Sequence, residues 1–131
     1  MSRLHVDLPT VMDLVRQNAA RSPDAPAFAD AEQSVTWGEF DRRTERAANA
    51  YLDYAVQGDR VAFLTESSVD QTVMLVGAMK AGCIVTNVHL KASTETLRYC
   101  IEETAPKVLV VDEQADTRGR RAAAGDRVQV E

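Results

Sequence analysis

Residues Gln57–Asp112 read QGDRVAFLTESSVDQTVMLVGAMKAGCIVTNVHLKASTETLRYCIEETAPKVLVVD, and this stretch decides the fold. Three short runs rich in apolar and β-branched residues lie at Arg60–Thr65, Cys83–Val88 and Lys107–Asp112. They alternate with two amphipathic helical patterns, and parallel strands need such crossover helices. The sequence therefore predicts an α/β fold built on a short βαβαβ parallel sheet with right-handed crossovers.

Each helix of this stretch has its own start and stop signals. Ser67 or Ser68 is placed to accept the first backbone N–H groups of one helix, and Ser93 does the same for the next. Gly82 supplies the left-handed residue that closes the first helix, and Pro106 precedes the last strand. The positions expected to pack inward are Val73, Met74, Val76 and Gly77 on the first helix and Leu97 and Ile101 on the second.

A helix and a hairpin are expected before this stretch. Thr10 and Asp13 form a capping-box pattern at the start of the helix, and the prolines within residues 22–26 end it. Two short extended pieces, Ala27–Asp30 and Ser34–Trp37, flank a polar turn and predict the hairpin. The helix face expected to be buried consists of Val11, Leu14, Val15 and Ala19.

A second long helix is expected after the hairpin. Thr36 and Glu39 repeat the capping pattern at its start, and Gly58 is expected to end it in a left-handed conformation. Charged side chains at 41–43 and 45 fall on the opposite face, toward water. The stripe expected to be buried consists of Phe40, Ala47, Ala48, Tyr51 and Leu52.

The composition of the 131-residue chain is that of one soluble globular domain, with 45% hydrophobic and 27% charged residues. Its net charge of -5 disfavours binding to the phosphate backbone of nucleic acids. No apolar run approaches the roughly 18 residues of a membrane-spanning helix, and the N-terminus lacks the apolar core of a secretory signal. We therefore expect a cytoplasmic protein without a nucleic-acid partner or a transmembrane segment.

The two cysteines and two histidines do not form a metal-binding pattern. Cys83 opens a strand and Cys100 lies in a helical segment, and free cysteine acts as a small hydrophobe in both places. His5 and His89 show no recognisable ligand spacing to the cysteines or to each other. We expect neither a disulfide framework nor a metal site.

The last segment, residues 113–131, differs from the rest of the chain. It places four arginines among alanine, glycine and acidic residues, a composition typical of a flexible, solvated tail. Val128–Val130 alternates apolar and polar residues, so the segment could instead end in the start of a strand whose neighbours are missing. Both interpretations stay open, and the chain divides into residues 1–112 and 113–131.

Five motifs occur along the chain in a fixed order: Arg21–Ala27 (RSPDAPA), Thr36–Phe40 (TWGEF), Gly58–Ala62 (GDRVA), Gly77–Gly82 (GAMKAG) and Ala105–Asp112 (APKVLVVD). In this order and spacing they resemble the N-terminal region of the adenylate-forming ligases, a family that includes acyl-CoA synthetases and aryl-CoA ligases. The resemblance covers roughly residues 8–112, most of this chain but only the opening part of a family member.

The resemblance implies a two-step reaction for a full-length relative. A carboxylate and ATP form an acyl-adenylate and pyrophosphate, and the CoA thiol then displaces AMP. ATP, Mg²⁺, CoA and a carboxylate substrate, often in fatty acid metabolism, are implied for that longer parent only. The sequence has no counterpart of the family's Ser/Thr/Gly-rich phosphate loop, adenine segment, ribose-binding Asp or late catalytic Lys. Residues 1–112 are therefore expected to be a scaffold, inactive alone, with no catalytic, cofactor-binding or metal residue.

Two loops depart from the family's pattern. The loop after the second strand usually reads P-[LV]-N, whereas here it is Asn87-Val88-His89. The turn that usually reads G-[VI]-x-x-G-D has lost its first glycine in residues 54–59. These departures concern loop geometry and not membership of the family.

Polar residues follow all three predicted strands, at the edge where open α/β sheets bind ligands. Ser67 or Ser68, His89 and Asp112 are the residue types of a nucleophilic triad, which would make the chain a small hydrolase. The sequence around the serines is not the glycine-flanked turn that exposes a nucleophile, so helix capping is the favoured interpretation. A further hypothesis, the steering of an anion, concerns Lys91 and Arg98, for which a solvated surface is favoured.

An alternative function is a stand-alone interaction module derived from the same family. Apolar helix faces at Val73, Met74 and Met79, or at Leu97 and Ile101, are expected to stay exposed beside an unpaired sheet edge. Such surfaces favour a homo-oligomer, with the strand-like segment near the C-terminus adding to a neighbour's sheet.

Overall fold

The computed structural model of the protein describes residues 9–113 and 128–130, and a four-stranded sheet forms its centre. The strands lie in the order β4-β3-β5-β6, and each neighbouring pair is parallel. Apolar and β-branched residues, which suit a pleated and buried surface, make up most of these strands. The predicted βαβαβ unit is confirmed. The strands span Arg60–Leu64 (β3), Ile84–Asn87 (β4), Val108–Val111 (β5) and Val128–Val130 (β6).

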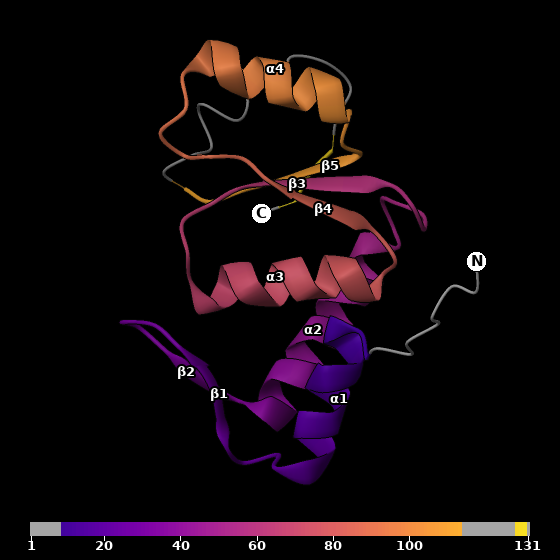
Figure 1. Ribbon diagram of the computed structural model, residues 1–131, viewed down its shortest axis with the longest axis vertical. Coiled ribbons are helices and arrows are strands. Elements are labelled where there is room, and N and C mark those ends of the chain that lie inside the picture. The colour runs from indigo at the N-terminus through magenta and orange to yellow at the C-terminus, as the bar shows by residue number, and fades with distance from the viewer. Residues whose placement is uncertain (1–8, 114–127, 131) are drawn as a thin grey trace, which may run out of the picture.

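Helices of the chain itself cover both faces of the sheet (Figure 1). Helix α3 (Val69–Lys80) lies on one face and α4 (Thr94–Thr104) on the other. Successive residues of β3 point to opposite sides, so that Val61 packs in the cluster on the α3 side and Ala62 packs with Leu97 of α4. A parallel sheet needs both faces buried, and this arrangement provides both layers.

The apolar positions of α3 and α4 are buried, which corrects the expectation that they stay exposed. Val73 is 5% exposed, and Leu97 and Ile101 are 0% and 1% exposed. Met74 and Met79 are partly buried. Because both helices lie directly on the sheet, Val73, Leu97 and Ile101 fill the space between helix and strands.

The N-terminal elements form a further layer beyond α3 (Figure 1). Helix α1 (Val11–Arg21) packs against α2 (Trp37–Tyr51), which in turn packs against α3. Strands β1 (Pro26–Ala29) and β2 (Ser34–Thr36) form the predicted antiparallel hairpin. One hydrophobic cluster therefore extends from the sheet through α3 to the N-terminal helices.

Helices α2 and α3 approach each other closely at Gly77. A Cβ atom on this residue would lie 2.5 Å from Ala47 Cβ, so only glycine fits without a shift. Lys80, near the end of α3, is also covered by α2, and its side chain is 2% exposed. Its Nζ lies 2.7 Å from Asp41 Oδ1 and 3.2 Å from Glu45 Oε1, so the buried ammonium is paired.

The predicted helix starts are confirmed by their caps. Thr10 and Asp13 form the reciprocal capping box at α1, and the Thr36 side chain accepts the N–H of Glu39 in the first turn of α2. Of the two serine candidates at α3, the structure selects Ser68, whose Oγ accepts the N–H of the residue three positions on at 3.0 Å. Ser93 caps α4 in the same way.

Three side chains expected in the core are exposed instead. Val11 and Leu14 on α1 are 48% and 46% exposed, because α1 needs only a narrow strip around Val15 to pack against its neighbours. Leu52 is 57% exposed, because it lies just past the end of α2. Gly58 also does not end α2 as expected, and its φ of 90° instead serves the turn that leads into β3.

Val128–Val130 forms a strand, as one of the two interpretations predicts, but its neighbour is not missing, because β5 of the same chain pairs with it. The segment therefore belongs to this chain's own sheet, and its addition to a neighbouring molecule's sheet stays a prediction. Residues 114–127 lie outside the described residues, so their flexibility stays a prediction. Within the described ranges, each helix is too short or too polar to span a lipid bilayer.

Candidate functional site

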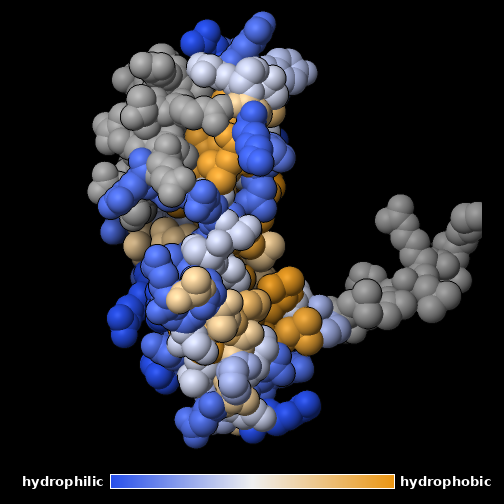
Figure 2. Space-filling view, turned by 90° about the vertical axis from the view of Figure 1, so that its left-hand side faces the viewer, coloured by the Kyte–Doolittle hydropathy of each residue, from blue (hydrophilic) through white to orange (hydrophobic). Residues whose placement is uncertain are grey.

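A cavity of about 680 Å³ lies where β3 and β5 end, between the hairpin tip (residues 30–33) and the start of α3. This is the edge at which open α/β sheets bind ligands. Figure 2 views this side of the molecule, where hydrophilic residues (blue) occupy much of the face and hydrophobic residues (orange) show in separate areas. The acidic side chains that line the cavity are Asp30, Glu32, Glu66, Asp70, Asp112 and Glu113.

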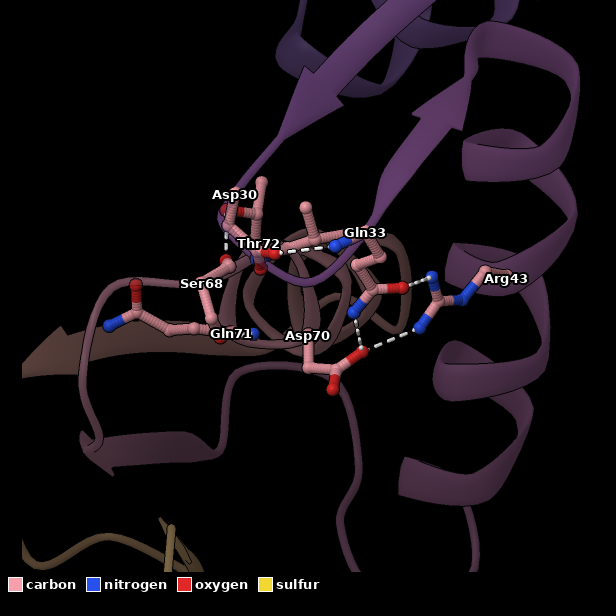
Figure 3. Close-up of polar contacts among 8 residues, drawn as sticks. Asp30, Gln33, Arg43, Ser68, Asp70, Gln71 and Thr72 are labelled. Atoms are coloured by element: carbon pink, nitrogen blue, oxygen red, sulfur yellow. Dashed lines mark hydrogen bonds and ion pairs between the residues drawn. The ribbon is translucent and has the colours of Figure 1, made fainter.

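Asp30 fastens the hairpin tip to α3 (Figure 3). Its Oδ1 accepts the backbone N–H groups of Glu32 and Gln33, each at 2.8 Å, and its Oδ2 accepts the N–H of Val69 at 2.9 Å. Val69 is the first residue of α3, where N–H groups lack partners within the helix and the helix dipole favours an anion. One carboxylate thus joins two elements that are distant in the sequence.

A second polar contact ties α2 to the same place (Figure 3). Arg43 donates to Asp70 Oδ1 at 2.6 Å and to Gln33 Oε1 at 3.1 Å. Gln33 Nε2 donates to the same Asp70 oxygen at 3.0 Å. The hairpin tip, α2 and α3 therefore meet in one hydrogen-bonded group at the rim of the cavity.

Replacing Asp30 with Asn should make the free energy of unfolding depend less on pH at acid pH. The N–H of Val69, followed by those of Glu32 and Gln33, lowers the pKa of Asp30 from its ordinary 3.8. Because folding lowers this pKa, the ionised Asp30 stabilises the folded protein at pH values above 3.8. This stabilisation is lost as the pH falls through the pKa of Asp30 in the folded protein. Urea unfolding at a series of pH values would measure this.

Glu32→Gln, on the same hairpin tip, is the matched control, since Glu32 contributes only its backbone N–H to the contact. We expect this variant to keep the pH dependence of the wild type. An Asp30→Asn variant that loses stability at acid pH as the wild type does would contradict the structural role of this carboxylate.

The structure does not assemble the hypothetical triad. Ser67, Ser68 and Asp112 all line the cavity, but His89 is not among its lining residues. His89 is exposed, and its Nδ1 accepts the N–H of Lys91 at 3.1 Å, so this nitrogen does not carry the proton that a triad histidine donates to its carboxylate. Asp112 Oδ2 accepts the backbone N–H that follows Thr65, at 2.7 Å.

Replacing Ser68 with Ala should cost about 0.5–2 kcal/mol of stability, because the N–H of Gln71 loses its acceptor at the start of α3. Ser67→Ala is the matched control, since Ser67 is exposed and is not the cap residue. Thermal melts of both variants would measure the difference. A fluorophosphonate probe should label neither serine, and labelling that disappears in His89→Ala would instead support the hydrolase.

The other candidate residues lie apart. Cys83 belongs to the hydrophobic cluster on the α3 side, whereas Cys100 lies on α4, across the sheet. His5 lies outside the described residues. The side chains of Lys91 and Arg98 are both exposed, and the steering of an anion by them stays a prediction.

The acidic lining determines which ligands suit the cavity. Among the residues that the structure describes, the lining includes six carboxylates and neither lysine nor arginine, so this part of the cavity favours a positive group over the phosphates of ATP. Within residues 9–113 and 128–130, no cluster of three or more His, Cys, Asp or Glu residues could hold a metal ion. The described lining therefore does not fit the phosphates of the ATP that the family resemblance implies.

Sequence reasoning missed Asp30, Arg43 and Asp70 as a connected group. Asp30 was expected only to end a strand, although an aspartate in a polar turn often accepts backbone N–H groups nearby. That signal predicts the local bonds to residues 32 and 33. It does not predict the bond to Val69, because the bond depends on where the hairpin packs.

Comparison with known proteins shows what this fold is similar to. The family model described as "AMP-binding enzyme" matches residues 15–131. The 3-hydroxybenzoate–CoA ligase of Aromatoleum sp. (strain CIB) is 33% identical over 90 residues, which cover 68% of this chain and 17% of the relative. The long-chain-fatty-acid–CoA ligase of Escherichia coli O6:H1 is 28% identical over 123 residues, which cover 85% of this chain and 22% of the relative.

Solved structures agree with these matches. A long-chain-fatty-acid CoA ligase structure from Rhodopseudomonas palustris CGA009 matches 84% of this chain and 28% of its own, with a TM-score of 0.81 and 27% identity. A benzoate CoA ligase from Burkholderia xenovorans LB400 matches 90% of this chain and 25% of its own, with a TM-score of 0.81. At 20% identity, the second match supports the fold alone. The chain spans about a fifth of the length of the two ligases compared by sequence.

Proposed function

The chain belongs to the AMP-binding enzyme family, and on this premise we propose that it is the N-terminal scaffold of an acyl- or aryl-CoA ligase. The observation that carries the proposal is the family match, which runs from residue 15 to residue 131. In such a ligase a carboxylate reacts with ATP to give an acyl-adenylate and pyrophosphate, and the CoA thiol then displaces AMP to give the thioester.

The scaffold role is supported by the structure of the cavity and of the core. Both faces of the sheet are covered, so the described residues hold one another in place. The carboxylates of the cavity disfavour the phosphates of a nucleotide. In this proposal the groups that bind ATP, Mg²⁺ and CoA come from other segments of a longer protein, and the present chain alone is inactive.

The proposal extends to the class of substrate but not to its identity. The relatives named above carry the names of an aromatic acid and of long-chain fatty acids, so a carboxylic acid is what they share. A cytoplasmic location and a place in fatty acid metabolism stay predictions.

A segment exchange tests the scaffold proposal. The matched segment of the Aromatoleum ligase is replaced by the corresponding residues of this chain, and 3-hydroxybenzoate-dependent CoA thioester formation is measured. We expect the chimera to keep measurable activity, because the exchanged residues build the fold and not the reaction centre. A folded chimera without activity would contradict the proposal, and Gly77→Val in the chimera is the control for loss of folding.

A second candidate function, a stand-alone interaction module, is favoured by one observation. The described residues close a core on both faces of the sheet, which a module needs in order to fold alone. In that case the chain would act by pairing with itself or with another protein through a surface that the core leaves open.

A further inference from the structure

Strand β4 forms an edge of the sheet. Among the described residues its neighbour in the sheet is β3 alone, whereas β3 and β5 each have neighbours on both sides. The N–H groups of Ile84 and Val88 donate to Asp59 O and Phe63 O of the β3 segment, both at 2.9 Å. Alternate residues of a strand in a parallel ladder point their backbone groups in opposite directions, so those of Val85 and Asn87 point toward the open edge.

This edge lacks the features that normally prevent strand addition. Natural edge strands carry charged side chains, proline or bulges, which stop another strand from pairing with them. Residues Ile84–Asn87 read IVTN, with neither charge nor proline, and three of the four are β-branched. Ile84 is 52% exposed although it is strongly apolar. The strand is therefore suited to pairing on its free side.

Asn87 completes the row of backbone N–H donors along the open edge of β4. Asn87 is the last residue of the strand, and it is exposed. Proline has no N–H and at this position would leave a gap in the outward row of donors. Asparagine supplies that donor, so Val85 and Asn87 both present an N–H and a C=O to a partner strand.

The surroundings of β4 match a second copy of the same strand. In an antiparallel pair related by a two-fold axis, the start of one β4 lies beside the end of the other. Asp59 and the exposed Arg60 lie beside the start of the strand, and the exposed Lys91 follows its end. In the pair, Asp59 of one copy attracts Lys91 of the other, and Arg60 offsets part of this attraction. Val56 lies near the start of the strand, because its carbonyl oxygen is 4.0 Å from Cys83 Sγ. The side chain of Val56 is 68% exposed and adds apolar surface beside the strand.

We propose that β4 pairs antiparallel with β4 of a second copy of this chain and joins the two four-stranded sheets into one. Val85 and Asn87 exchange backbone hydrogen bonds across the two-fold axis, and Ile84 is covered by the partner. The inference does not depend on the ligase proposal, because it concerns only the edge of the sheet. Two such short strands bury less area than a tight dimer does, so a dissociation constant in the micromolar range is expected.

Light scattering over a micromolar concentration series tests the proposal on the whole chain. The wild type should rise toward twice the monomer mass, and Asn87→Pro should stay at the monomer mass because its outward N–H is lost. Asn87→Ala keeps the N–H and is the matched control, which should dimerise like the wild type. Thermal melts should show that all three are folded.

Hydrogen exchange provides a second readout at the level of single residues. The amides of Val85 and Asn87 should become protected as the concentration rises, while the amide of Ile84, which already bonds to the β3 segment, should not change. A wild type that stays monomeric throughout the series would overturn the proposal. A dimer that persists unchanged in a folded Asn87→Pro variant would overturn it too, because the interface would then lie elsewhere.

Discussion

Replacing Gly77 with Val should destabilise the protein by about 3 kcal/mol, at the upper end of the usual cost of overpacking a core. A Cβ atom at this position would lie 2.5 Å from Ala47 Cβ and 3.2 Å from Thr44 O, both on α2. Valine adds two further methyl groups to that contact, so α2 and α3 must move apart. Urea unfolding followed by circular dichroism would measure the loss.

Smaller substitutions separate the contact from other effects of the mutation. Gly77→Ala should also destabilise, although alanine favours a helix by about 1 kcal/mol over glycine. Combining it with Ala47→Gly removes the closest contact, so the double variant should be more stable than the sum of the two single changes predicts. A Gly77→Ala variant at least as stable as the wild type would contradict the close approach of the helices.

Replacing Phe40 with Ala should cost about 3–5 kcal/mol, because it removes a fully buried ring from the N-terminal layer. The ring of Phe40 lies 4.8 Å from that of Phe28 and 6.2 Å from that of Trp37, measured between centroids. Trp37 is the sole tryptophan of the chain, so its fluorescence reports directly on this group.

Phe28→Ala is the matched control for Phe40. The two residues have the same side chain and touch each other, but Phe28 is 37% exposed and loses less on truncation. We expect chemical unfolding to show a clearly smaller loss for Phe28→Ala. Equal losses would mean that burial does not determine the contribution of this aromatic group.

Local signals in the sequence were enough to predict most of the elements. The strand at Val108–Val111 is a short apolar run after a proline, and the starts of α1 and α4 follow from single capping residues, Thr10 and Ser93. These signals act over three or four residues, so they can be read without knowing the fold.

Features that depend on packing between distant segments were not predictable in this way. Val11 and Leu14 match the apolar period of a helix, yet they are exposed because α1 lies outside the sheet layers. The bond from Val69 to Asp30 and the pairing of β6 with β5 join residues far apart in the chain. No local pattern indicates which partner such groups find.

The most direct test of the scaffold role is carboxylate-dependent ATP–pyrophosphate exchange by the purified chain, across aliphatic and aromatic acids. Adenylation requires groups that stabilise the charge developing at phosphorus. The described lining of the cavity offers carboxylates instead, so no exchange above background is predicted for any acid. Acid-dependent exchange that survives repurification would show that the chain catalyses adenylation itself and would contradict a purely scaffolding role.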